Sequence, residues 1–338
     1  MKNLLKFVIF ILFVAIGTAG LLSFFGLKPT GYIPDNGTDI QVRSGESVRS
    51  LSMRLENDRY IGSAILFEVI VRATNLDKQL RTGWFHIDKD SSTLDIIKTI
   101  FSGRLLTVRF TIPEGSTVRQ IRDILVNNGI VEPEEIDRLL NNPNYTSIIG
   151  LDGFRSAEGF LFPDTYTVNK GTLAADILAV LVRQFYNEVS KIYPQYRSLS
   201  HNEFFKKIII ASIIEKEVRS YEEAPIVAGV FYNRIENGML LQSCATVQYI
   251  LDKPKERLLF EDLEIDNPYN TYLYRGLPPG PVSNPGREAL NAAFYPTSHN
   301  YLFFVVKDPV LGTHHFSRTF AEHLAAQERY KAIRGFFD

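Results

Sequence analysis

A glutamate stands near the end of one of the most apolar stretches of the chain. The segment FFKKIIIASIIEKEV, residues 204–218, places Glu215 directly after a run rich in isoleucine. Each residue of a helix advances by about 100°, so Glu215 lies roughly 20° from Phe204 and Ile208 around the helix axis. It therefore continues an apolar stripe. Glu217, about 200° further round, is expected to face water.

An apolar setting gives a carboxyl group a chemistry that a solvated one lacks. Desolvation penalises the charged form, so the pKa of the carboxyl rises toward neutrality. Such a group can give a proton to a leaving oxygen and later take one back. A glutamate that instead leaves the helix end toward water, or pairs with an arginine, has no such role. The stripe alone leaves both interpretations of Glu215 open.

Polar and aromatic residues gather in segments rich in glycine and proline elsewhere in the chain. The four segments are EGFLFPDTY, VFYNRIENGMLLQS, NPYNTYLYRGLPPGPVSNPG and YLFFVVKDPVLGTHHFSRTFAEH. Such segments commonly do no more than turn the chain. Tyrosine rings also stack on sugars, however, and side-chain amides bind hydroxyl and acetamido groups. Four of these segments together favour a groove for a sugar polymer beside Glu215.

Helices and a late pair of strands are expected to position these segments. Apolar periodicity and capping residues predict three helices, over residues 173–193, 201–218 and 222–238. Residues 239–300 are dense in Asn, Pro, Gly and Tyr and are expected to form loops. The last predicted elements are strands at 301–306 and 313–320 and a helix at 321–333.

An internal repeat precedes this region. The two copies, which align without gaps, are VRSGESVRSLSMRL (42–55) and IPEGSTVRQIRDIL (112–125). Each copy predicts a strand end, a turn at Gly45 or Gly115, an N-cap at Ser47 or Thr117, and a short helix. Residues 87–104 form a looser third copy that lacks the glycine. Small units of this kind suit a binding or spacing module.

The N-terminus has the pattern of a membrane anchor. Lys2 and Lys6 precede an uncharged run over residues 7–27, and about 20 helical residues cross the hydrocarbon layer of a bilayer. GTAG at 17–20 resembles a cleavage site, but a cleaved signal peptide has a shorter apolar core. We therefore expect one uncleaved span with a cytoplasmic start and with everything from residue 29 onward outside.

Composition excludes several other classes of protein. A length of 338 residues allows two domains, and a net charge of −1 lacks the basic surplus of a nucleic-acid binder. Cys244 is the only cysteine, so no intramolecular disulfide can form. The histidines lack the spacing of metal-ligand motifs, and adjacent His314 and His315 would point to opposite sides of a strand. We expect no catalytic metal and no other cofactor.

Taken in order, five segments resemble the YceG-like family of endolytic murein transglycosylases. They are EGFLFPDTY (158–166), ASIIEKEV (211–218), AGVFYNRIENGMLLQSCATVQY (228–249), NPYNTYLYRGLPPGPVSNPG (267–286) and the YLFFVV to FAEH stretch (301–323). The resemblance spans nearly the whole chain and implies an α+β fold. The implied parts are a cytoplasmic start and transmembrane anchor at 1–28, a linker at 29–39, a small LysM-like α/β module with the internal repeat at 40–147, and a mixed α+β catalytic domain at 148–338.

The resemblance implies a membrane-anchored lytic transglycosylase. Such an enzyme cleaves the bond between N-acetylmuramic acid (MurNAc) and N-acetylglucosamine (GlcNAc) in peptidoglycan without water and leaves 1,6-anhydro-MurNAc ends. Glu215 would act as general acid and then as general base. Ordinary glycosidases use two carboxylates, but here the sugar itself supplies the nucleophile. The implied partners are glycan strands, the membrane and peptidoglycan synthases, on the outer side of the cytoplasmic membrane.

The same motifs supply candidates for substrate binding. Glu223 falls at a second acidic position of the family motif. The other candidates are Gln242, Ser243, Thr246, Asn270, Tyr272 and Asn284. The chain departs from the family pattern at LQSCATV, where Cys244 stands in place of the expected Asp and Ala245 in place of the expected Pro. An inert peptidoglycan-binding scaffold therefore stays open as an alternative, as does a hydrolytic muramidase.

Overall fold

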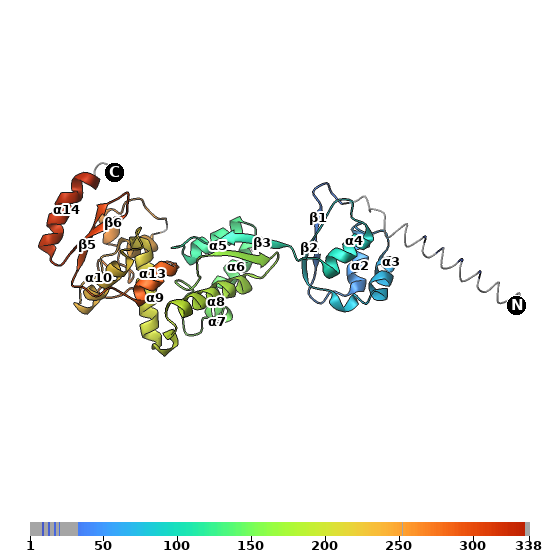
Figure 1. The fold of residues 1–338 in the computed structure, drawn as a ribbon, viewed down its shortest axis with the longest axis horizontal. Coiled ribbons are helices and arrows are strands. Elements are labelled where there is room, and N and C mark those ends of the chain that lie inside the picture. The colour runs from blue at the N-terminus through green and yellow to red at the C-terminus, as the bar shows by residue number, and fades with distance from the viewer. Residues whose placement is uncertain are drawn as a thin grey trace. The chain divides into compact units, whose positions relative to one another are not determined.

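The computed structural model describes residues 33–251 and 253–334, together with the isolated positions 9, 13, 17 and 20. Helices dominate the described residues, and the strands form three two-stranded sheets (Figure 1). The expected mixed α+β class is confirmed. The chain divides into two compact units, of which the first holds Met1–Val108 and Thr167–Thr172 and the second holds Arg109–Tyr166 and Leu173–Asp338.

The expected membrane anchor lies outside the part of the chain that the structure describes. Residues 7–27 lie outside the described residues, except for four isolated positions. Over residues 33–251 and 253–334, none of the helices combines the length and the apolar character that a membrane span needs.

The first unit is built around an antiparallel strand pair. Its elements are β1 (Thr38–Val42), α2 (Val48–Asn57), α3 (Ala64–Ala73), η1 (Asp77–Gln79), β2 (Gly83–Ile87) and α4 (Thr93–Ser102). Ile40 pairs with Phe85 across the two strands, and both side chains are buried. Leu51, Phe67 and Ile96, one from each helix, complete the same apolar core. Alternation in the strands and helical periodicity in the helices therefore converge on one interior.

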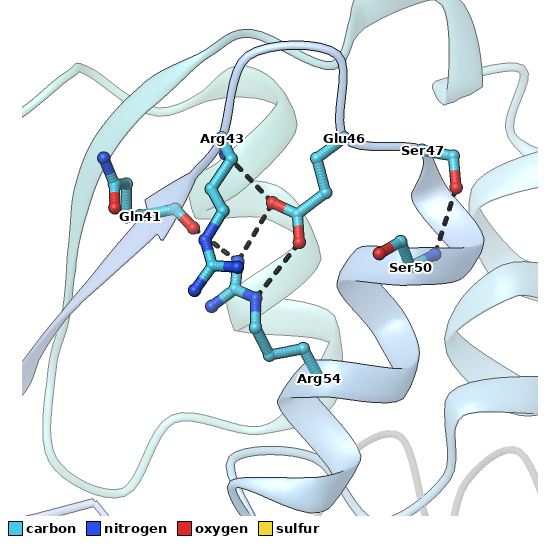
Figure 2. A network of polar contacts seen from close by, with 6 residues as sticks. All are labelled: Gln41, Arg43, Glu46, Ser47, Ser50 and Arg54. Carbon is cyan, nitrogen blue, oxygen red and sulfur yellow. Dashed lines mark hydrogen bonds and ion pairs between the residues drawn. The ribbon is translucent and has the colours of Figure 1, made fainter.

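A polar network ties the turn after β1 to α2 (Figure 2). The Glu46 carboxylate accepts hydrogen bonds from the backbone N–H of Arg43 at 2.9 Å and from Nε of Arg54 at 3.0 Å. Ser47 caps α2 by accepting from the N–H of Ser50 at 3.1 Å. The turn thus satisfies backbone donors that the strand and helix leave unpaired.

The second unit contains most of the helices. Its elements begin with β3 (Thr107–Thr111), α5 (Val118–Asn127), α6 (Pro133–Leu140), α7 (Tyr145–Ile148), β4 (Thr165–Asn169), α8 (Ala174–Ile192) and η2 (Tyr196–Ser198). They continue with α9 (His201–Glu217), α10 (Ala224–Glu236), α11 (Cys244–Ile250), α12 (Phe260–Leu263), α13 (Arg287–Phe294), β5 (Phe303–Asp308), β6 (Thr313–Ser317) and α14 (Phe320–Arg334). Strands β3 and β4 pair with each other, and α9 packs against α10, α11 and α13.

The predicted helices α8, α9, α10 and α14 and the predicted strands β5 and β6 are confirmed. The prediction of loops throughout 239–300 is wrong, because α11, α12 and α13 lie there. Helix α13 buries Ala289, Leu290 and Ala293. Alanines carry a weak apolar signal, so a short helix that buries mainly alanine is hard to distinguish from a loop by pattern.

The strand, turn and helix expected in each copy of the internal repeat are present, and the same local pattern occurs at a further place in the chain. In each copy a strand leads to a residue with positive φ, an N-cap two positions later, and a helix. The positive-φ residues are Gly45, Asp90, Gly115 and Gly171, before α2, α4, α5 and α8. Asp90 replaces the glycine in the looser third copy, since aspartate tolerates the left-handed region better than most residues. The fourth copy, at Gly171, was not predicted.

The division into units differs from the predicted boundary at residue 147. Residues 109–147 belong to the second unit, where α6 packs against α8. The second copy of the repeat therefore lies in the unit that carries Glu215. The first unit contains a strand–helix–strand arrangement closed by the β1–β2 sheet.

Candidate active site

Glu215 lies in the last turn of α9, whose start is fixed by a capping box. Ser200 accepts from the N–H of Glu203 at 3.3 Å, and the Glu203 carboxylate accepts from the N–H of Ser200 at 2.9 Å. Phe204 and Ile208 are buried, as the stripe predicts, while Glu215 itself is partly buried. The helix thus places the carboxyl group of Glu215 at the edge of the apolar interior.

The surroundings of Glu215 favour its protonated form. Its Oε2 accepts a hydrogen bond from the backbone N–H of Gly286, the N-cap residue of α13, at 2.9 Å. Burial raises the pKa of Glu215 to about 7, against the lowering effect of the Gly286 N–H. The negative charge of Glu114 raises this pKa further, and Lys216 lowers it. Glu215 can therefore gain and lose a proton near neutral pH.

The turn before α5 brings a second carboxyl group to Gly286. Tyr221 donates its hydroxyl hydrogen to Oε2 of Glu114 at 2.8 Å. A Cβ atom on Gly286 would lie 2.0 Å from Oε1 of Glu114. A Cβ on Gly115, which has a φ of +71°, would lie 3.4 Å from Cγ of Glu215. Close approach of the segments around Glu215 thus depends on these two glycines. Glu114 is not among the site residues that the sequence predicts.

Two open cavities flank the start of α5. The first, of about 410 Å³, is lined by Pro113, Glu114, Gly115, Ser116, Gln120, Asp123, Ile124, Asn127 and Lys216. The second, of about 420 Å³, is lined by Thr117, Val118, Arg119, Gln120, Ser156, Glu158, Gln248, Tyr249, Ile250, Leu251, Pro254, Asn267 and Tyr269. Gln120 lines both. The rings of Tyr249 and Tyr269 lie 5.0 Å apart in the second cavity, which gives it an aromatic wall beside amide groups.

Glu158 is a buried acid that the sequence analysis quoted within a motif but did not single out. Only 4% of it is exposed, and burial raises its pKa to about 8. Its two carboxyl oxygens accept from the N–H of Val118, and Nδ2 of Asn284 donates to Oε1 at 3.0 Å. Because Val118 begins α5, this carboxyl group caps the helix beside both cavities. The available signal was an acidic residue at the start of an aromatic segment that contains glycine and proline.

The expectation that Glu217 faces water is wrong. Its Oε1 accepts from Oγ of Ser243 at 2.5 Å, and the backbone N–H of Ala245 also donates to it. Burial raises the pKa of Glu217 in spite of these donors. Helix α9 is covered on several sides, and α11 begins where a single-faced helix would meet solvent. Glu217 therefore caps α11.

The carboxylate of Glu223 contacts β6, which forms a hairpin with β5. Its Oε2 accepts from the backbone N–H of His314 at 2.9 Å and contacts Nδ1 of the same histidine at 2.8 Å. Glu223 precedes α10, so this contact joins α10 to β6. Neither Glu223 nor Glu215 is among the residues that line the two cavities, although Lys216, next to Glu215, lines the first.

Several predicted binding residues are buried and bonded within the protein. Asn284 is fully buried: its Oδ1 accepts from the N–H of Leu161, and its Nδ2 donates to the carbonyl of Ser116 and to Glu158. Asn270 is also fully buried and donates to the carbonyls of Leu263 and Ile265. These two amides hold loops together, since buried backbone groups need partners.

Ser243, Thr246, Gln242 and Tyr272 gather at the start of α11. Thr246 is fully buried and donates to the carbonyl of Ser243 at 2.8 Å. Gln242 is exposed and has a φ of +49°, a strained backbone conformation for a residue with a side chain. The hydroxyl of Tyr272 lies 3.1 Å from Sγ of Cys244. Of this group, Gln242 is the residue whose side chain is most available to a ligand.

No group of three or more His, Cys, Asp and Glu side chains suited to a metal ion occurs in the described part of the chain. Cys244 is a free thiol at the first position of α11. Desolvation raises the pKa of this thiol, so it stays protonated at neutral pH.

Comparison with known proteins places the chain in a family. The YceG-like family model matches residues 40–329. An endolytic murein transglycosylase of Bacillus subtilis strain 168 is 30% identical over 330 residues, covering 93% of this chain and 91% of its own. A protein of the same name from Streptococcus pneumoniae strain D39 is 27% identical, covering 88% of this chain and 60% of its own.

A solved structure is similar over most of the chain. A YceG-like protein from Listeria monocytogenes is 30% identical, with a TM-score of 0.57, covering 86% of this chain and 99% of that one.

Proposed function

Since the chain belongs to the YceG-like family, we propose that it is a lytic transglycosylase that cleaves peptidoglycan glycan strands with Glu215 as its acid and base. The observation that carries this proposal is the environment of Glu215. Its carboxyl group is partly buried at a helix end, with a pKa raised by burial to about 7 and one backbone donor from Gly286. One group with these properties can serve both halves of the reaction.

In the first half, protonated Glu215 gives its proton to the glycosidic oxygen between MurNAc and GlcNAc. The bond between that oxygen and C1 of MurNAc breaks, and positive charge develops at C1. The N–H of Gly286, 2.9 Å from Oε2, stabilises the carboxylate that this transfer leaves on Glu215.

In the second half, the carboxylate takes the proton of the C6 hydroxyl of the same MurNAc residue. O6 then bonds to C1 and closes the 1,6-anhydro ring. Glu215 ends protonated, as it began, and no water is consumed. The raised pKa supports this step too, because it makes the carboxylate a stronger base.

The glycan would occupy the two cavities beside α5. They share Gln120 and are lined by amide and hydroxyl side chains, with the rings of Tyr249 and Tyr269 available for stacking. A site extended over two cavities suits a polymer cut within its length. Gln242, exposed at the start of α11, is a further candidate for contact with the acetamido group.

The buried candidates act indirectly in this proposal. Asn270, Thr246 and Asn284 hold the loops that form the site, and Glu223 fixes the hairpin through His314. Residues 7–27 would anchor the enzyme as a single span. The catalytic unit would then lie outside the cytoplasmic membrane, beside newly made glycan and its synthases.

The test is a digest of purified peptidoglycan by the full chain, with products examined by mass spectrometry. We expect anhydro-ended fragments from the wild type and their loss in Glu215→Gln. Glu222→Gln, a matched change at an exposed neighbour, should keep the activity. Intact glycan that remains bound to the wild type would instead support the inert scaffold.

A further inference from the structure

Glu114 and Glu215 lie against the same glycine although they are far apart in sequence. Gly286 donates its N–H to Oε2 of Glu215 at 2.9 Å. The position of a Cβ on Gly286 is 2.0 Å from Oε1 of Glu114. The mechanism above uses only one of these two carboxyl groups, and the exposed one, Glu114, lines the first cavity.

The position of Glu114 is fixed from two directions. The hydroxyl of Tyr221 donates to Oε2 at 2.8 Å. The turn itself is joined to the segment before α13, because the N–H of Gly115 donates to the carbonyl of Asn284 at 2.9 Å and the N–H of Asn284 donates to the carbonyl of Ser116 at 2.9 Å. Asn284 is fully buried, so this junction is part of the interior.

We propose that Glu114 is a positioning residue for the catalytic proton: its carboxylate, held at Gly286 by Tyr221, keeps Glu215 protonated at the start of each cycle. This inference rests on the proposed function and adds a residue that controls it. Two neighbouring carboxyl groups cannot both ionise at low cost. Glu215 is the more buried member of the pair, and burial penalises its charged form.

The other charges near Glu215 are consistent with this division. Burial is the largest cause of its raised pKa, and the Gly286 N–H and Lys216 act against it. Nζ of Lys216 donates to the carbonyl of Gly115 at 3.3 Å, so this cation lies near the same turn. The charge of Glu288 raises the pKa of Tyr221, whereas the charged side chains that shift the pKa of Glu215 are Glu114 and Lys216. Without the charge on Glu114, burial alone would oppose the effects of Lys216 and the Gly286 N–H, and Glu215 would lose its proton more readily.

The test is a titration that needs no substrate. The full chain is labelled with ¹³C at the glutamate side-chain carboxyl carbon, and the signal absent in Glu215→Gln is followed across pH by NMR. Glu114→Gln keeps the shape of the side chain and can still accept from Tyr221. We expect it to lower the midpoint of Glu215 by about 0.5–1 pH unit. Glu114→Asp, which keeps the charge, should restore most of the shift.

Two further variants separate charge from structure. Gly286→Ala keeps every charge but pushes the flexible end of Glu114 aside, so we expect a smaller fall in the same midpoint. Glu288→Gln removes a nearby charge that does not act on Glu215, and the midpoint should stay in place. An unchanged midpoint in Glu114→Gln, or an equal fall in Glu288→Gln, would overturn the proposal. Failure of the proposed function would appear differently, as an absence of anhydro products with this titration intact.

Discussion

The backbone N–H of Gly286 and Oε2 of Glu215 lie 2.9 Å apart, which joins the start of α13 to the end of α9. A donor at a helix start favours the carboxylate, whereas burial favours the acid. Burial prevails and raises the pKa of Glu215 to about 7. A carboxyl group balanced in this way can alternate between its two forms within one catalytic cycle.

The rate of cleavage should follow the protonation of Glu215. Because the first step needs the acid form, the rate should fall about tenfold between pH 6 and pH 8 as the carboxyl loses its proton. Initial rates of anhydro product formation, measured at low substrate concentration across this range, check the prediction. Equal rates at pH 6 and pH 8 would count against a protonated Glu215 as the acid.

Gly115→Ala should impair catalysis more than its cost in stability explains. Gly115 and Gly129 flank α5 with φ of +71° and +63°, so alanine strains the backbone similarly at both, by about 1 kcal/mol. Only at Gly115 does the new Cβ meet Glu215 and Lys216, at 3.4 and 3.2 Å. The two variants should therefore have similar melting temperatures, whereas kcat should fall more in Gly115→Ala. Equal loss of kcat in both would show that the close approach to Glu215 is unimportant.

Glu158→Gln should flatten the dependence of stability on pH. The pKa of Glu158 is raised from 4.5 to about 8, so its protonation stabilises the folded state. That contribution is fully present below pH 4.5 and is lost as pH rises through 8, at about 1.4 kcal/mol per pKa unit. The Tm of the wild type should fall between pH 5 and pH 9. In Glu158→Gln the Tm should fall much less over the same range. Glu261→Gln, an exposed control, should behave as the wild type. A parallel fall in all three proteins would refute this role for Glu158.

Cys244→Asp should keep most of the activity. The position is the first of α11, where an acidic residue is favoured by the helix dipole, but Glu217 already caps this end. We expect kcat/KM within about threefold of the wild type, because ΔΔG‡ for a residue outside the reacting groups is small. A gain of two orders of magnitude in anhydro product would mean instead that the cysteine disables the natural chain.

The local features of the site could be predicted from the sequence, and the contacts across it could not. Helical periodicity placed Glu215 on a buried stripe because Phe204 and Ile208 belong to the same helix. Glu114 escaped notice because its nearness to Glu215 depends on how the turn before α5 meets α13, which no local pattern encodes. The repeat predicted a turn at Gly115, which has a φ of +71° in the structure, without indicating what the turn contacts.

Glu217 and Asn284 illustrate the limits of judging polar residues by position. A helical wheel assigns Glu217 to solvent only if one face of α9 is covered, whereas α10, α11 and α13 all pack against it. Asn284 lies in a segment whose composition is typical of a ligand-binding loop. Its side chain is nevertheless fully buried and hydrogen-bonded to Leu161, Ser116 and Glu158. Its amide forms hydrogen bonds with backbone groups that would otherwise be buried without a partner. These groups become buried only when the chain folds, so the sequence does not reveal them.

The central claim is that the C6 hydroxyl of MurNAc, and not water, attacks C1 when the glycosidic bond breaks. Glu215 transfers the proton in both halves of the reaction. This claim is tested most directly by digesting peptidoglycan with the full chain in water enriched in ¹⁸O. The masses of the new MurNAc ends are then measured by mass spectrometry. The account predicts 1,6-anhydro ends without ¹⁸O, formed by the wild type and lost in Glu215→Gln. Reducing ends that carry ¹⁸O would contradict it and would identify a hydrolase.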